Sequence, residues 1–252
     1  MNGNCRELLY SVFKVKMLLR LNRLARSADE HVANQRPGIS EGDWKAIERD
    51  VVSKLACQER DRIVEIGCGT GLLGEVIADH VRFYVGFDLI QKLLQRAKTR
   101  NRSRHACFIL ADGKALPVRG ASIDRVLVYS VILFLPPIIL RFLLRECYRI
   151  LKPHGLMLLG DIPNPDQAMN FLAKKQVEKD DVPLFLQLRL SLFMAKKRLQ
   201  RMLNMPGAGW YRPWDVMKIL SEEGFDCRYA EQGMHLPFGH YRYDCLASRR
   251  GE

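Results

Sequence analysis

The segment RIVEIGCGTGLLG, residues 62–74, constrains the fold more than any other part of the chain. A short apolar run ends in a cluster of glycines and leads into residues typical of a helix, which predicts a buried strand, a tight turn and a helix N-terminus. Such a turn gathers unpaired backbone N–H groups at the positive end of the helix dipole. The segment therefore predicts a binding site for a nucleotide-like ligand.

Two glycine fingerprints overlap in this segment. Gly69, Gly71 and Gly74 have the GxGxxG spacing of dinucleotide folds. Glu65, Gly67, Gly69 and Gly71 instead form an acidic-x-GxGxG pattern. The carboxylate of Glu65 would repel a pyrophosphate but attract a ligand that carries an ammonium and a sulfonium group. It therefore favours S-adenosylmethionine over a dinucleotide, and leaves Gly74 to ease packing of the helix on the sheet.

The rest of the chain alternates between strand and helix patterns. Short apolar runs predict buried parallel strands at 62–66, 82–87, 106–110, 124–128 and 155–160. Helical patterns lie at 71–79, 90–100 and 137–151, followed by a helix at 213–224 and strands at 226–231 and 240–248. Ser40 and Asp43 predict the start of an earlier helix with Trp44, Ile47, Val51 and Leu55 on its buried face. This order indicates a doubly wound α/β sheet in a single domain, 1–252.

Further polar residues follow the predicted strands. Asp88 ends the second strand, where a carboxylate accepts hydrogen bonds from ribose hydroxyls. Asp112 and Gly113 follow the third strand, near the position of an adenine whose ribose is held by Asp88. Because Asp88 ends a strand and is not a core residue, we expect Asp88→Ala to weaken cofactor binding before it affects folding.

Four blocks of sequence together resemble the class I S-adenosylmethionine-dependent methyltransferase family, in its small-molecule branch. They are VEIGCGTG at 64–71, VGFDLI at 85–90, ADGKALPVRGASIDRVLVYSVILFL at 111–135 and ECYRILKPHGLMLLGD at 146–161. The resemblance implies a Rossmann-like seven-stranded sheet of order 3-2-1-4-5-7-6 with the last strand antiparallel. Independently of the resemblance, the helical patterns before the first strand predict an N-terminal helical lid at 1–56, and the long insertion after the fifth strand predicts a helical lid at 163–209. His154 stands where the family commonly has glycine, so we expect a local change of turn there.

The resemblance and the residue chemistry together predict the cofactor site. Its expected residues are Glu65, Gly67, Cys68, Gly69, Gly71, Asp88, Leu89, Asp112, Gly113 and Tyr129. No metal site is predicted, since the seven cysteines contain no CxxC pair. Their odd number also argues against a disulfide framework and for a reducing, cytoplasmic location.

The methyl acceptor is expected at the edge of the sheet where the parallel strands end. Transfer to a hydroxyl needs a group that removes the proton, usually a histidine or a carboxylate. Asp161, after the fifth strand, is one candidate, with Tyr129 and Ser130 nearby after the fourth. The loop QGMHLPFGHYRYD at 232–244 would bring His235 and His240 to the same edge, and His31 in the N-terminal lid is a weaker candidate. His80, His105 and His154 precede strands and so belong to the opposite edge.

The sequence leaves the acceptor open. We favour O-methylation of a small molecule, a sugar or glycan precursor or a natural product, with Arg242 and the basic lid in contact with an acidic or phosphorylated acceptor. N- or C-methylation of a quinone or lipid, or of RNA, is the alternative. The formal charge of +12 suits a nucleic acid, but YSVI at 129–132 is unlike the Asn/Asp-Pro-Pro-aromatic motif of base-amine methylases. A basic amphipathic helix over 6–26 packs on the domain or contacts a membrane surface.

Overall fold

The computed structural model describes residues 15, 18–29, 33–34, 38–167, 191–193, 195–199 and 209–251. Its seven strands form one sheet of order β3-β2-β1-β4-β5-β7-β6, in which only β7 runs against its two neighbours. The strands are β1 (Arg62–Ile66), β2 (Phe83–Asp88), β3 (Ala106–Leu110), β4 (Ile123–Tyr129), β5 (Leu151–Pro163), β6 (Phe225–Glu231) and β7 (Arg242–Arg249). The predicted fold class is confirmed.

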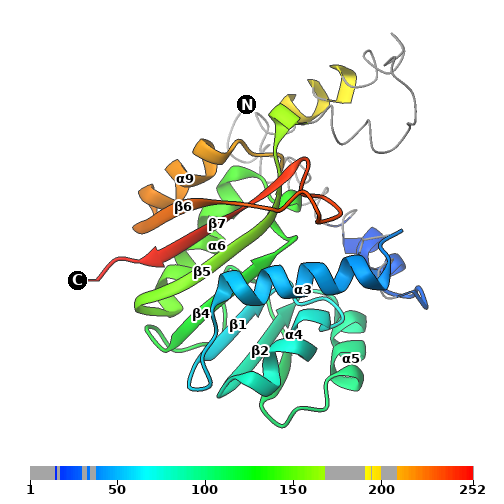
Figure 1. Ribbon diagram of the computed structural model, residues 1–252, viewed down its shortest axis with the longest axis vertical. Helices are drawn as coiled ribbons and strands as arrows, with labels where there is room; N and C mark the ends of the chain where they lie inside the picture. Colours follow the sequence, from blue (N-terminus) through cyan, green and yellow to red (C-terminus); the bar gives the residue numbers. More distant parts are fainter. Residues whose placement is uncertain are drawn as a thin grey trace.

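Helices cover both faces of this sheet (Figure 1). They are α3 (Glu41–Leu55), α4 (Leu72–Ile77), α5 (Gln91–Arg100), α6 (Pro137–Ile150) and α9 (Pro213–Glu222), with short 3-10 turns η1 (Ala78–His80), η2 (Ile132–Phe134) and η3 (Pro165–Gln167). Residues of α3, α4 and α5 pack on one face, where they meet Leu127 of β4. Residues of α6 and α9 pack on the other face, against Val126 and Val128. Both faces of the central strands are therefore apolar, which explains their unbroken hydrophobic runs.

The start of α3 is fixed by a capping box. The Ser40 hydroxyl accepts a hydrogen bond from the Asp43 backbone N–H, and the Asp43 carboxylate accepts one from the Ser40 backbone N–H, each at 3.1 Å. These bonds satisfy N–H groups that a helix end otherwise leaves unpaired. The predicted N-cap is confirmed, and the four predicted apolar side chains of α3 are buried in the core.

The strand β5 begins earlier than the predicted 155–160. Leu151 already pairs with Ile123, and the register with β4 shifts before Leu156 pairs with Arg125. His154 lies in this irregular stretch with a left-handed φ of 61°, a conformation in which glycine is more comfortable. The expected local change of turn at His154 thus takes the form of a bulge at the start of β5.

The N-terminal segment, here the described residues 18–29 and 33–34, packs on α5. Leu18 and Leu21 contact a small cluster around Ile90 and Leu93. Arg96 of α5 donates hydrogen bonds to the last carbonyl groups of this segment, at Ala25, Ser27 and Ala28. The lid prediction for 1–56 and 163–209 stays a prediction, because much of both ranges, with His31, lies outside the described residues.

None of the helices in the described ranges has the length and apolar character that would let it cross a membrane.

Candidate active site

A cavity lies beyond the carboxyl ends of β1, β2 and β4. It encloses about 1160 Å³ of empty space, part of it open to solvent. Its walls come from the loop between β1 and α4, the residues that follow β2, β3 and β4, the helix α6, and the N-terminal segment. Nine of the residues predicted to bind cofactor line it: Glu65, Gly67, Cys68, Gly69, Asp88, Leu89, Asp112, Gly113 and Tyr129. The open-sheet rule for ligand sites predicts this location.

The glycine loop turns sharply where it faces the cavity. Gly67 and Gly69 have left-handed φ angles of 77° and 55°. A Cβ atom on Gly67 would collide with Val131, and one on Gly69 would collide with the side chain of Asn34. Only glycine fits both the backbone conformation and the space, so the bare main chain forms this wall.

The other two glycines of the motif serve packing. Gly71 precedes α4 with φ of 76°, and a Cβ there would lie 2.9 Å from the Cβ of Ala97 on α5. Gly74 lies within α4, where a Cβ would lie 2.8 Å from the ring of Tyr84. Gly71 does not line the cavity as the sequence predicted, whereas the packing role of Gly74 is confirmed. Of the four glycines, Gly67 and Gly69 are the ones that line the cavity.

Asp88 ties the glycine loop to the end of β2. Its carboxylate accepts hydrogen bonds from the backbone N–H of Gly69 at 3.0 Å and of Ile90 at 2.8 Å. Burial raises the pKa of Asp88, and these N–H donors oppose the rise. The backbone N–H of Leu89 also interacts with this carboxylate. A carboxylate offers about four acceptor sites, so these contacts leave capacity for a ribose hydroxyl. Because Asp88 also holds the loop, our expectation that Asp88→Ala would spare folding needs correction.

Glu65 is buried on the face of the sheet that α3 and α4 cover. The hydroxyl of Tyr84 donates a hydrogen bond to its carboxylate. Burial raises the pKa of Glu65 to about 7, against the lowering effect of the Tyr84 bond. This carboxyl group therefore changes its charge near neutral pH at the wall of the cavity.

The part of the cavity wall formed by residues after β2 and β3 suits a flat apolar group. Leu89 is 40% exposed there. Asp112 forms an ion pair with Lys114 at 3.4 Å and accepts a hydrogen bond from the Lys114 N–H at 3.2 Å. Gly113 lies against Ile66 and Leu143, with no room for a Cβ. An apolar surface beside a carboxylate and a bare backbone fits the face and the edge of an adenine.

A second polar group borders the cavity at Ser130, directly after β4. The Ser130 hydroxyl donates a hydrogen bond to the carboxylate of Asp161, which also forms an ion pair with Arg242 of β7. Asp161 is 1% exposed. Ser130 and Asp161 both have left-handed backbones, with φ of 60° and 63°. Two such strained non-glycine residues side by side are characteristic of functional sites.

Comparison with known proteins identifies the domain. Residues 64–159 match a family model described as a methyltransferase domain. This range contains the glycine loop, Asp88 and Asp112. The chain carries a class I S-adenosylmethionine-dependent methyltransferase domain.

Curated relatives match this methyltransferase domain over part of their own length. A "probable S-adenosylmethionine-dependent methyltransferase" of Mycolicibacterium smegmatis is 31% identical over 129 residues, which are 49% of this chain and 48% of that protein. The 18S rRNA (guanine-N(7))-methyltransferase of Bos taurus is 30% identical over 86 residues, 32% of this chain and 30% of that protein. The chain thus spans less than half the length of either relative.

A solved structure shares the fold of the methyltransferase domain. The magnesium protoporphyrin IX methyltransferase of Synechocystis PCC 6803, with S-adenosylhomocysteine bound, has a TM-score of 0.60 over 96% of this chain and 99% of that chain. Its sequence identity is 15%, so the likeness concerns the fold.

The histidines proposed for the methyltransferase lie away from the cavity wall. His235 is exposed near Gly233, and the ring of His240 meets Tyr241 edge-on at 4.8 Å. Neither is among the described residues that line the cavity. Asp161 does not line it either, but its partner Ser130 does. Among the three predicted catalytic residues, Asp161 has a direct contact with a described residue of the cavity wall, Ser130.

Two residues near this site were not predicted from the sequence. Asn34 of the N-terminal segment lines the cavity and contacts Thr70 of the glycine loop. Asp244 of β7 accepts a hydrogen bond from the backbone of Asp161. Asp244 ends the loop that was noted for its histidines, and each of the two residues is far in sequence from the residue that it contacts.

Proposed function

We propose that this protein transfers a methyl group from S-adenosylmethionine to a hydroxyl group of a small molecule, a sugar or glycan precursor or a natural product. Asp161 accepts the proton of that hydroxyl. The observation that carries the proposal is the Ser130–Asp161 pair, which joins a buried carboxylate to the wall of the cofactor cavity.

Each wall of the cavity has a role in this proposal. S-adenosylmethionine, when bound, supplies a methyl group on a positively charged sulfur that leaves readily as a neutral thioether. Asp88 holds the ribose, while Asp112 and Gly113 face the adenine. Gly67 and Gly69 let the methionine part approach the main chain. Glu65 favours the positive charge of the ligand once its carboxyl group is ionised.

The transfer needs the acceptor oxygen, the methyl carbon and the sulfur in line, and one group that accepts the hydroxyl proton. The acceptor oxygen binds beside Ser130 and forms a bond to the methyl carbon as the carbon–sulfur bond breaks. The hydroxyl proton passes to the carboxylate of Asp161. Arg242 lies against this carboxylate and favours its ionised, proton-accepting form.

The surroundings of Asp161 support a small acceptor. The Arg242 guanidinium lies over the rings of Phe238, at 4.5 Å, and Tyr241, at 5.2 Å. Tyr241 stacks in turn on Trp210, and both rings are buried. A carboxylate recessed behind aromatic rings is reached more readily by a small molecule than by a base within a folded RNA.

Arg242 is an unsuitable contact for an anionic acceptor. Its charge is already paired with Asp161, so a phosphate or carboxylate on the acceptor would have to meet other basic residues. The sequence suggested a direct contact, and the structure gives Arg242 a different partner.

Methylation of RNA, or of a quinone or lipid at a membrane surface, is the competing proposal. It is favoured by the net charge of +12, and one relative is described as an rRNA methyltransferase. Three of the six basic residues at 6–26 that would touch a membrane, Arg6, Lys14 and Lys16, lie outside the described residues.

A reducing, cytoplasmic location is also proposed. The cysteines in the described ranges, at 57, 68, 107, 147, 227 and 245, all have free thiols.

A labelling experiment separates the acceptor classes. The protein and tritiated S-adenosylmethionine are incubated in three separate reactions. The first contains a mixture of sugar nucleotides and phenols, the second total RNA, and the third quinone-containing phospholipid vesicles. We expect label in the first mixture, a loss of about 100-fold or more in Asp161→Asn, and unchanged cofactor affinity in that variant. Label in RNA or vesicles alone, or full activity of Asp161→Asn, would refute the proposal.

A further inference from the structure

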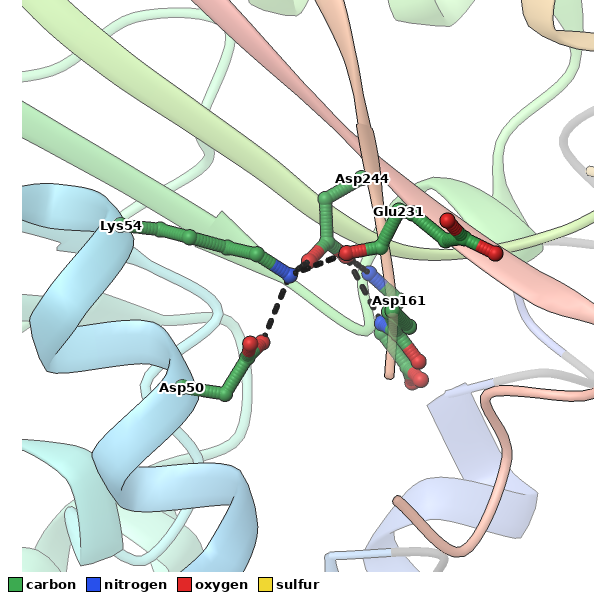
Figure 2. A network of polar contacts seen from close by, with 6 residues as sticks. Asp50, Lys54, Asp161, Glu231 and Asp244 are labelled. Carbon is green, nitrogen blue, oxygen red and sulfur yellow. Dashed lines mark hydrogen bonds and ion pairs between the residues drawn. The ribbon is translucent and has the colours of Figure 1, made fainter. Parts of the chain in front are cut away.

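A buried polar network lies behind Asp161, on the side of the sheet that α3 covers. Its centre is Asp244 of β7, which is fully buried. One carboxylate oxygen accepts a hydrogen bond from the Lys54 ammonium of α3 at 2.6 Å. The other accepts from the backbone N–H of Asp161 at 2.8 Å and from the Gln232 amide at 2.7 Å. Figure 2 shows Lys54 reaching from its helix to this carboxylate.

The ammonium group of Lys54 is fully engaged as well. Besides Asp244, it donates to the carboxylate of Asp50 at 2.7 Å and to the backbone carbonyl of Glu231 at 2.9 Å (Figure 2). An ammonium has three donors, so each has one partner. The network thus joins α3, β5, β7 and the end of β6 around a single carboxylate.

Stability alone is a poor explanation for this network. Burial raises the pKa of Asp244, and the Lys54 ammonium opposes that rise. Withdrawing two charges from water costs about as much free energy as their attraction returns, and apolar residues of similar size often stabilise a protein at least equally well. What an apolar pair would lack is an acceptor for the Asp161 N–H.

That N–H needs an acceptor because β5 is bulged at this point. The register between β5 and β7 shifts between Leu159 and Ile162, and Asp161 has a left-handed φ of 63°. A bulged residue leaves the hydrogen-bond ladder, and a buried N–H without a partner costs roughly 1–3 kcal/mol. Asp244 supplies the acceptor and thereby stabilises the strained backbone of Asp161.

The backbone conformation of Asp161 sets the direction of its side chain. From this conformation its carboxylate contacts both Ser130 at the cavity wall and Arg242. We infer that Asp244, Lys54 and Gln232 form a positioning network that aims the Asp161 carboxylate at the methyl acceptor. This inference rests on the proposed role of Asp161 as proton acceptor.

Lys54 has a second effect through charge. Asp161 contacts Ser130, which follows β4, and Arg242 and Asp244 of β7. Asp244 in turn contacts Lys54 of α3, which also contacts Asp50, and Tyr129 of β4 lies near Arg242. If Lys54 were uncharged, Asp244 would stand as an uncompensated negative charge next to Asp161. Like charges raise the pKa of a carboxyl group. Asp161 would then stay protonated, and unable to accept a proton, up to a higher pH.

Three variants test the network. Asp244→Ala removes the acceptor of the Asp161 N–H, and we expect kcat to fall by about tenfold or more with unchanged cofactor affinity. Lys54→Met should shift the acidic limb of the kcat profile to higher pH. Lys54→Met combined with Asp244→Asn removes both charges but keeps an acceptor oxygen, so it should restore the original profile. A purely structural role would give no such shift and rescue.

The control is a similar ion pair at the other end of the sheet. Lys152 contacts Asp124 at 2.6 Å, near the start of β1, so Lys152→Met should leave kcat and its pH profile unchanged. Crystal structures provide a readout that needs no acceptor: in Asp244→Ala, Asp161 should leave the left-handed region and lose its contact with Ser130.

The outcomes separate this inference from the proposed function. If Asp161→Asn abolishes transfer but Asp244→Ala keeps the wild-type kcat, the positioning network is refuted and the proposed function stands. If Asp244→Ala does not fold, the double variant decides in the same way: a pH profile that is not restored refutes the network. If Asp161→Asn is fully active, the proposed function fails first. An Asp244→Ala structure with Asp161 unmoved refutes the network whatever the acceptor.

Discussion

The side-chain amide of Asn34 contacts Thr70 through both of its polar atoms. Its oxygen accepts a hydrogen bond from the Thr70 N–H at 3.1 Å, and its nitrogen donates to the Thr70 hydroxyl at 2.7 Å. The N-terminal segment is thereby joined to the glycine loop at the wall of the cofactor cavity.

Asn34→Ala should loosen the N-terminal segment. Two hydrogen bonds are lost at about 1 kcal/mol each, so we expect faster tryptic cleavage after Arg23 and Arg26 and up to about tenfold weaker cofactor binding. Limited proteolysis and calorimetry measure these effects. Asn101→Ala, at the end of α5, is the control and should change neither quantity. Wild-type cleavage and affinity in Asn34→Ala would show that the contact does not hold the segment.

Replacing Asp88 should affect both binding and stability. Asp88→Ala leaves the N–H groups of Gly69 and Ile90 without their acceptor, so the free energy of unfolding should fall by roughly 1–3 kcal/mol. Asp88→Asn keeps an acceptor oxygen and should lose less stability, yet both variants should bind S-adenosylmethionine more weakly. Urea unfolding and calorimetry on the same samples provide the comparison. Wild-type affinity in Asp88→Ala would rule out the ribose contact.

The charge of Glu65 predicts how cofactor affinity depends on pH. Its pKa is raised to about 7 by burial, so below pH 7 the carboxyl group is mostly protonated and must release a proton to meet a cationic ligand. Affinity should therefore rise with pH, by at most about tenfold per unit below pH 7, and level off above it. Titration of the ligand itself affects both proteins equally. Glu65→Gln should therefore lack only the rise in affinity that comes from the Glu65 carboxyl group. Identical pH profiles for the two proteins would contradict the assignment.

Gly67 and Gly74 should respond differently to the same substitution. Gly67→Ala places a methyl group against Val131 at the cavity, from a left-handed backbone, and should weaken cofactor binding. Gly74→Ala presses a methyl group on the Tyr84 ring inside the core and should cost about 1–3 kcal/mol of stability. Affinity is measured on the folded fraction of each variant. Weaker cofactor binding in Gly74→Ala, with unchanged binding in Gly67→Ala, would instead favour the dinucleotide fingerprint.

Local sequence patterns were sufficient for most of the fold. The capping box at Ser40 and the apolar strands are determined by residues close to one another in the chain. The carboxylates of the cavity wall were also predictable, because the ends of parallel strands lie at one edge of a sheet. Glu65, Asp88 and Asp112 therefore line one cavity, as their positions at or just beyond the ends of successive strands indicated.

Contacts between distant segments were not predictable from such patterns. Lys54 and Asp244 are 190 positions apart, and no periodicity connects a helix before the sheet with the last strand. The bulge at Asp161 depends on the pairing of β5 with β7, which a single strand pattern does not encode. His235 and His240 were placed by the edge of the sheet alone, and their exact direction depends on the loop before β7.

We propose that the glycine motif binds S-adenosylmethionine and not a dinucleotide. Isothermal titration of the full chain with S-adenosylmethionine and, separately, with NAD tests it directly. We expect binding of S-adenosylmethionine that is weaker in Gly67→Ala, and no heat of binding from NAD. Binding of NAD without binding of S-adenosylmethionine would contradict it.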